Sequence, residues 1–209
     1  RPEIVGGQIS AVMDDIHPTA VKIGMVNDAE TIHAIAKTLG RYKDVAVIID
    51  PVMVSTSGCR LMQEDALQVF RTELMPLATL LTPNVPEAEI LSGIKIETVD
   101  DMDRAAKRIC NEAGCAVLVK GGHLDGNTKT DILYTDGQRT ATYEAQTVST
   151  RNTHGTGCTL SSAITAHLAL GNTMADAIRL AKTYLYKALE AGKDVEIGRG
   201  HGPVNHFFN

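Results

Sequence analysis

The residues from Asn152 to Thr159 read Asn-Thr-His-Gly-Thr-Gly-Cys-Thr and run into an alanine-rich helical pattern. Glycines here let backbone N–H groups converge, and a helix N-terminus adds free donors and the positive end of its dipole. The segment therefore predicts a cradle for a phosphate group. Cys158 falls in the first helical turn, where the dipole favours a thiolate, so it is a candidate base or nucleophile. The alternative is a tight packing loop with an inert cysteine.

A second polar group follows the short apolar run that ends at Thr82, and α/β proteins bind ligands at such strand ends. Asn84 and Glu87 stand three residues apart, and an amide with a carboxylate suits a magnesium shell completed by water. The same two residues also suit the start of a helix, with Asn as the cap and Glu near the positive end. Both interpretations stay open, although capping is the commoner use of such residues.

Two further strand ends carry a charged residue. Lys120 precedes two glycines after a buried apolar run, so it can place a positive charge near a phosphate that approaches the backbone closely. Asp50 ends the most apolar run of the chain and can orient magnesium or a substrate group. The alternatives are a solvated lysine and a simple strand terminator. Residues 54–60, which include an incidental Cys59, are expected to form a mobile loop or lid.

These candidate residues are positioned by apolar runs that alternate with helical patterns. The β-branched runs predict strands at residues 20–24, 45–49, 78–82 and 116–119. The helical spacings predict helices at residues 29–40, beginning over 64–71, and at 85–92, 100–113, 155–170 and 174–191. Asp136-Gly137 between two alternating segments predicts a hairpin near one edge of the sheet. The sequence therefore predicts one α/β domain with a mostly parallel sheet covered on both faces.

Composition excludes several classes of function. The chain has 209 residues and a formal net charge of −5, with 4% aromatic residues and no Trp, so we expect no nucleic-acid partner. No apolar run is long enough to cross a membrane. Its four cysteines form no CxxC pair, which disfavours a zinc site and favours a reducing, cytoplasmic location. The motifs of P-loop ATPases, GxGxxG dinucleotide folds and GxSxG hydrolases are absent from the sequence.

Five segments occur in an order that closely resembles the hydroxymethylpyrimidine/phosphomethylpyrimidine kinases of thiamine biosynthesis, which belong to the ribokinase-like superfamily. They read VKIGM, DPVMVSTSG, LLTPNVPEAEIL, VLVKGGH and NTHGTGCTLSSAI. The resemblance extends from about residue 1 to residue 206. The last segment is the most specific, because this family carries Cys at position 158 where ribokinase relatives usually carry Asp. The resemblance implies a three-layer α/β/α fold, and we expect residues 1–209 to form a single kinase domain.

The resemblance also implies an activity and a phosphate site. Members transfer the γ-phosphate of ATP to 4-amino-5-hydroxymethyl-2-methylpyrimidine and then to its monophosphate, with Mg²⁺ bridging phosphates. By this likeness, Gly155, Thr156, Gly157 and Cys158 form the anion hole at the helix N-terminus. Cys158 stands where a general base acts on the substrate hydroxyl. Such a reaction needs positioning and charge stabilisation rather than a covalent intermediate.

The remaining roles are carried over position by position. Asn84 and Glu87 match an Asn-x-x-Glu motif that organises Mg²⁺ and phosphate, and Lys120 matches a contact to the nucleotide phosphates. Asp50 lies in the region that supports the metal, and Met25 matches a residue near the pyrimidine ring. The implied partners are a small pyrimidine substrate and a second copy of the chain in a homodimer.

The sequence departs from the family pattern at its start. The family begins with a glycine-rich strand segment that holds much of the pyrimidine site, and this segment is absent from the sequence given. We therefore expect a domain that is incomplete at its N-terminal end. The alternatives to a pyrimidine kinase are a pyridoxal kinase on the same scaffold and a non-catalytic ligand-binding relative. The combination of Cys158, its neighbouring glycines, Asn84 and Glu87 argues against the non-catalytic alternative.

Overall fold

The computed structural model describes residues 1–54, 61–124 and 126–208 of the chain. Most of the loop expected at residues 54–60, with Cys59, lies outside the described residues. Six strands form one sheet in the order β1-β2-β3-β4-β5-β6. Their bounds are β1 Ala20–Ile23, β2 Ala46–Ile49, β3 Leu80–Leu81, β4 Ala116–Lys120, β5 Thr128–Thr135 and β6 Gln138–Gln146. The first four strands are parallel, and β5 and β6 add in antiparallel fashion, which confirms the mostly parallel sheet.

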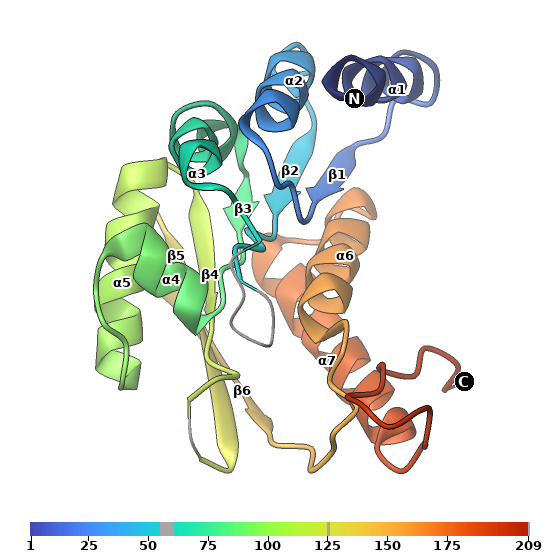
Figure 1. Cartoon of the computed structure of the whole chain (residues 1–209). Helices are drawn as coiled ribbons and strands as arrows, with labels where there is room; N and C mark the ends of the chain where they lie inside the picture. Colours follow the sequence, from blue (N-terminus) through green and yellow to red (C-terminus); the bar gives the residue numbers. More distant parts are fainter. Residues whose placement is uncertain (55–60, 125, 209) are drawn as a thin grey trace.

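Helices cover both faces of this sheet (Figure 1). One face carries α1 Pro2–Asp15, α2 Ala29–Leu39, α3 Glu64–Val69, α4 Val85–Ser92 and α5 Val99–Ala113, and the other carries α6 Thr156–Ala169 and α7 Met174–Gly192. The helices between the parallel strands lie together on the first face because the strands follow one another in a single direction and crossovers keep one hand. Among the described residues, no helix is long and apolar enough to cross a membrane.

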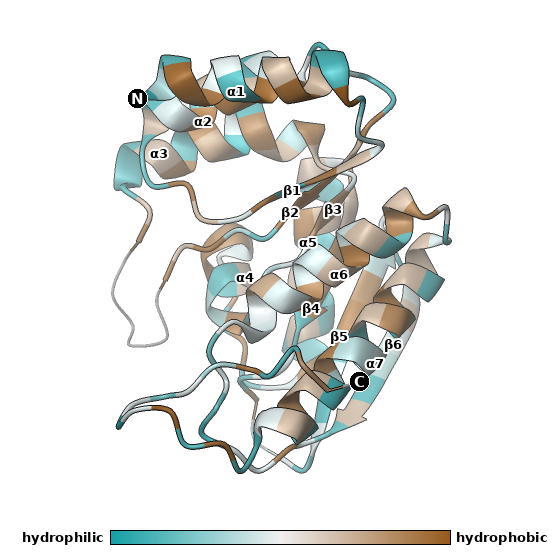
Figure 2. Ribbon diagram, turned by 90° about the vertical axis from the view of Figure 1, so that its right-hand side faces the viewer, coloured by the Kyte–Doolittle hydropathy of each residue, from teal (hydrophilic) through white to brown (hydrophobic). Residues whose placement is uncertain are grey.

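Successive side chains of the central strands enter two buried clusters, one on each face of the sheet. Figure 2 shows the apolar colouring of these strands between the helical layers. Ile48 packs with α6 and α7, whereas its neighbours Val47 and Ile49 pack with the helices on the opposite face. Successive side chains of a strand point to opposite faces, so a fully apolar strand serves both layers. The residues that face α6 and α7 in the same way are Leu80, Leu118 and Leu133.

The chain departs from two of the expected boundaries. Strand β3 has two residues rather than five, yet the N–H groups of Thr79 and Thr82 still donate to carbonyls of β2, at 2.7 and 2.9 Å. Helix α3 ends at Val69 and continues as a π-helical turn over Phe70–Leu74. Pro76 follows that turn and has no N–H, so regular α-helical bonding cannot continue through it. The hairpin is confirmed, with positive φ angles of 51° at Asp136 and 72° at Gly137.

Candidate active site

The candidate residues meet where the parallel strands end and α6 begins. Asp50 follows β2, Lys120 ends β4, and the Lys120 N–H donates to the Pro83 carbonyl at 2.9 Å, which brings the β3–α4 turn alongside. A Cβ atom built on Gly157, in the first turn of α6, would lie 3.5 Å from Nζ of Lys120 and 3.6 Å from Oδ2 of Asp50. Segments that lie far apart in the sequence therefore form one cluster beneath the glycine turn.

Asp50 is the centre of this cluster and is 2% exposed. Its Oδ1 accepts a hydrogen bond from Nζ of Lys120 at 2.7 Å and from the Thr82 hydroxyl at 3.2 Å. The Ser161 hydroxyl lies 3.3 Å from Oδ2, and it also reaches the carbonyl of Gly157 at 3.1 Å. Thr82 and Ser161 lie inside two of the quoted segments but were not singled out, because the sequence does not show which hydroxyl groups will face Asp50.

Lys120 is not the solvated lysine of the simpler interpretation. Its side chain is 13% exposed, and its ammonium group forms an ion pair with Asp50. A buried charge is tolerated where it is paired and hydrogen-bonded, and the Asp50 carboxylate supplies both conditions. The ammonium group is thereby held next to Gly157, where an anion that binds to the α6 N-terminus would meet it.

Asn84 and Glu87 do form the helix cap that the sequence left open. The Asn84 side chain accepts from the Glu87 N–H at 3.0 Å, and the Glu87 carboxylate accepts from the Asn84 N–H at 2.8 Å. This capping box begins α4. Glu87 is nevertheless unusual, because burial raises the pKa of its carboxyl to about 7, and Asp50 adds to the rise while Lys120 opposes it. A cap residue coupled to both members of the ion pair belongs to the cluster as well.

The α6 N-terminus has the geometry expected of an anion cradle. Gly155 is its N-cap, with φ of 87°, a value that favours glycine, and it offers no side chain to occupy the free donors of the first turn. Thr156 and Gly157 are half-buried, and Cys158 is an exposed free thiol. The structure therefore confirms the expected placement of these four residues around the start of one helix.

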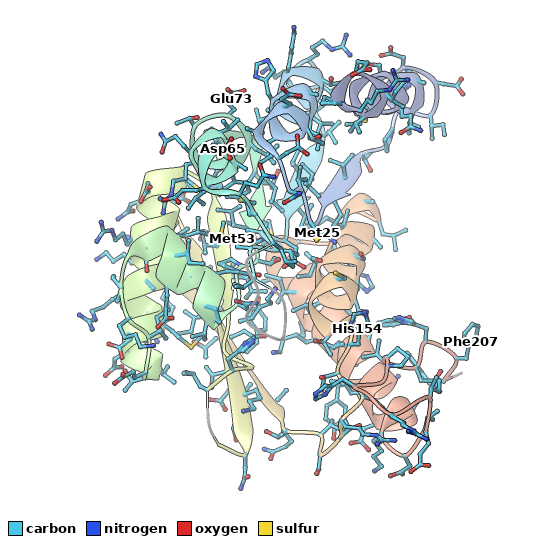
Figure 3. The ribbon with its side chains drawn as sticks, viewed as in Figure 1. Met25, Met53, Asp65, Glu73, His154 and Phe207 are labelled. Carbon is cyan, nitrogen blue, oxygen red and sulfur yellow. The ribbon has the colours of Figure 1, made fainter. Side chains whose placement is uncertain are left out.

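Met25 lies at the same edge of the sheet as Asp50, because it follows β1 as Asp50 follows the neighbouring parallel strand β2. Its side chain is 60% exposed (Figure 3). An apolar side chain this accessible, close to the strand ends, is free to contact a bound molecule.

The cluster offers oxygen ligands that suit magnesium. Among the described residues, no three His, Cys, Asp or Glu side chains are grouped to enclose a metal ion. Magnesium commonly uses only one or two carboxylates and completes its shell with water and substrate phosphates. Asp50 and Glu87 are close enough for the charge of Asp50 to affect the titration of Glu87. The ligand types therefore suit magnesium, while both oxygens of Asp50 already accept hydrogen bonds from protein groups.

Comparison with known proteins places nearly the whole chain in one family. A family model described as phosphomethylpyrimidine kinase matches residues 1–205. A protein from Rhizobium meliloti named hydroxymethylpyrimidine/phosphomethylpyrimidine kinase is 48% identical over 206 residues, which cover 98% of this chain and 77% of that protein. The sequence similarity therefore extends well beyond the segments that hold the cluster.

Two solved structures are similar to the fold. A phosphomethylpyrimidine kinase from Clostridium difficile has a TM-score of 0.78 and 42% identity, covering 90% of this chain and 77% of that chain. A pyridoxal kinase from Bacillus subtilis in complex with ADP has a TM-score of 0.88 and 35% identity, covering 97% and 75%. In sequence, this chain is thus more similar to the Clostridium difficile kinase. In backbone, it is more similar to the Bacillus subtilis pyridoxal kinase.

Proposed function

The chain belongs to the phosphomethylpyrimidine kinase family, and from this premise we propose that the cluster below the α6 N-terminus is its phosphoryl-transfer site. The chain is a phosphotransferase with a ribokinase-like fold. It uses ATP to phosphorylate 4-amino-5-hydroxymethyl-2-methylpyrimidine and its monophosphate in thiamine biosynthesis. The family membership agrees with the resemblance drawn from the motifs.

One observation carries the assignment of the site: the ammonium group of Lys120 lies directly below the glycine turn, 3.5 Å from a Cβ position at Gly157. A phosphate held by the first-turn N–H groups of α6 would therefore meet a buried cation as well. Phosphoryl transfer develops charge on the transferred group, and fixed donors with a cation stabilise that charge without reorganising. Gly155 and Gly157 would supply the donors, and Thr156 would join them once its N–H leaves the Thr153 carbonyl, to which it donates at 3.3 Å. Lys120 would contact the nucleotide phosphates.

Cys158 is the proposed general base. It stands in the first turn of α6, next to the proposed phosphate position, and its thiol is exposed to a substrate. Cys158 would take the proton of the substrate hydroxyl as that oxygen bonds to the γ-phosphorus and ADP departs. Asp50, Asn84 and Glu87 would hold the hydrated magnesium ion, which neutralises phosphate charge when it is bound.

Several further properties are proposed on the same basis. Met25 would contact the pyrimidine ring, because it is exposed at the strand ends. Residues 1–209 would belong to one kinase domain, since all described strands belong to one sheet. The chain would work as a homodimer, as the resemblance implies. The free thiols of Cys110, Cys115 and Cys158 fit a reducing compartment, so a cytoplasmic location is proposed.

A pyridoxal kinase activity is the second candidate, because the backbone overlaps more fully with the Bacillus subtilis pyridoxal kinase. The test measures the single-turnover rate with Mg·ATP for the pyrimidine alcohol, its monophosphate and pyridoxal. We expect faster transfer to the two pyrimidines. Faster transfer to pyridoxal would overturn the substrate assignment and leave the proposed phosphate site intact.

The role of Cys158 is tested in the same assay. Cys158→Ser should lower the rate by about 10²–10⁴-fold, the usual contribution of a general base, and Cys158→Asp should recover part of it. Cys115→Ser is the matched control, because Cys115 is a free thiol outside the site whose pKa is raised by burial to about 12. A Cys158→Ser enzyme within a few-fold of the parent rate would show that the base lies elsewhere.

A further inference from the structure

The loop that leads into α6 is held by a segment near the C-terminus of the chain. Asn152 lies three residues before the Gly155 cap and is 3% exposed. Its side-chain amide donates two hydrogen bonds, to the Gly192 carbonyl at 2.6 Å and to the Val195 carbonyl at 2.7 Å. Both N–H groups of this buried amide therefore bind backbone carbonyls some forty positions later, one at the last residue of α7 and one three residues beyond it.

His154, the residue immediately before Gly155, is held by the same C-terminal segment. Its N–H donates to the Gly202 carbonyl at 3.0 Å, and its own carbonyl accepts from the Val204 N–H at 3.2 Å. The two bonds form a short parallel bridge between His154 and Pro203. Figure 3 places His154 at the start of α6. The backbone that leads into the first turn of α6 is thus held by hydrogen bonds from the C-terminal segment.

Gly202 fits closely against this loop. A Cβ atom built there would lie 2.1 Å from Oδ1 and 2.8 Å from Cγ of Asn152, but 3.5 Å from its Cβ. Position 202 therefore requires glycine because the Asn152 amide occupies the space that a Cβ atom would need. An alanine at position 152 would leave ordinary van der Waals distance for an alanine at position 202.

The C-terminal segment is itself fixed to α7. The Asn205 N–H donates to the Ala188 carbonyl at 3.1 Å, its side-chain amide donates to the Ala191 carbonyl at 3.3 Å, and Val204 is buried. Figure 1 shows this segment passing beside the loop that enters α6. Residues 192–205, called here the C-terminal strap, therefore connect the end of α7 to the entrance of α6.

We propose that the C-terminal strap is a positioning element for phosphoryl transfer, and that Asn152 and Gly202 form the contact through which it orients the first turn of α6. The inference rests on the proposed function of that turn as the phosphate cradle. In the proposed function, nucleotide binding would also use Lys120, Asn84 and Glu87, which lie outside the strap. Loss of the contact should therefore lower kcat and leave the KM for ATP nearly unchanged.

The test is a double-mutant cycle. A misplacement of about 1 Å in an active site costs on the order of 100-fold in rate, so Gly202→Ala alone should lower kcat by about that factor. Asn152→Ala should also lower kcat. In the Asn152→Ala background the added Gly202→Ala should change kcat by less than about 3-fold, because directly contacting residues are not additive. Asn172→Ala is the matched control, since it removes an amide bond to His167, at the far end of α6.

Hydrogen exchange supplies a readout that does not depend on catalysis. The amides of His154 and Val204 should exchange faster in Gly202→Ala and Asn152→Ala, and at the parent rate in Asn172→Ala. Unchanged exchange at these amides, or additive losses of kcat in the cycle, would overturn the inference. A variant that lowers only the melting temperature, with kcat per folded molecule unchanged, would reduce the strap to a stabilising contact and overturn it too.

The same measurements separate this inference from the proposed site. Suppose exchange at His154 and Val204 rises while kcat stays at the parent value. If Cys158→Ser then loses activity as expected, the site stands and the strap has no positioning role. If Gly157→Val also keeps the parent rate, no phosphate is held at the α6 N-terminus, so the proposed site is wrong and the positioning role built on it falls as well.

Discussion

Glu87→Gln is expected to raise the free energy of unfolding at neutral and alkaline pH. The same substitution is expected to weaken magnesium-dependent binding of ATP. The carboxyl of Glu87 is buried, and this burial raises its pKa from 4.5 to about 7. Between these two values the folded state binds a proton that the unfolded state has lost. Stability must therefore fall as the pH rises through this window. Glutamine has the same shape, carries no charge and can still accept from the Asn84 N–H.

The magnitude follows from the shift. One pKa unit corresponds to about 1.36 kcal/mol, so the rise from 4.5 to about 7 costs the ionised enzyme about 3 kcal/mol. Glu87→Gln should remove this cost above about pH 7 and change little below about pH 4. The measurement is the free energy of unfolding in urea at a series of pH values, for the parent and the variant.

The control is Glu89→Gln, two positions along the same helix. Glu89 is a partly exposed carboxylate that accepts from the Ile96 N–H at 2.8 Å, and a glutamine keeps that bond. The Glu89→Gln variant keeps Glu87, so its free energy of unfolding should still fall as the pH rises from about 4.5 to about 7. If the free energies of unfolding of Glu87→Gln and the parent change in parallel between about pH 5 and pH 8, burial does not raise the pKa of Glu87. Calorimetry on the same variant should show weaker, less magnesium-dependent binding of ATP.

Two further predictions concern the turn above the ion pair. Gly157→Val should greatly reduce turnover, since a branched side chain would fill the space beside Lys120 and Asp50. The circular dichroism spectrum should stay unchanged. A variant that turns over at the parent rate would show that no phosphate is held there. Lys120→Met should destabilise the fold by about 3–5 kcal/mol in urea unfolding, because Asp50 is left buried without its cation. A loss below about 1 kcal/mol would mean that solvent reaches Asp50.

The sequence predicted the secondary structure well, and it also predicted which candidate residues come together, because both depend on local patterns. Helix α4 has the expected bounds, and the turn at Asp136 and Gly137 forms the expected hairpin. The candidate residues at strand ends do meet, since parallel strands carry their carboxyl ends to one edge of the sheet. Boundaries were less certain where tertiary bonding decides them, as at the short strand β3.

What the sequence could not show is which side chains pair across the fold. Asp50 and Lys120 lie 70 residues apart, and nothing in either segment indicates an ion pair with the other. The Ser161 hydroxyl reaches Asp50 from a distance of 111 residues in the chain. Asn152 stands inside the most specific motif, yet its partners are backbone carbonyls, which have no sequence signature. Such contacts depend on the relative placement of whole elements, which periodicity does not specify.

The two-sided sheet has a consequence for how the chain is made. Strands β1 to β5 and the helices of one face leave the ribosome before α6 and α7, which cover Ile48, Leu80, Leu118 and Leu133. Until those last helices arrive, a growing chain presents four large apolar side chains on one surface, the kind of surface that leads incomplete chains to aggregate. Ser161 and the strap also belong to this late part. A nascent chain that still lacks α6 and α7 therefore exposes the kind of apolar surface that chaperones bind.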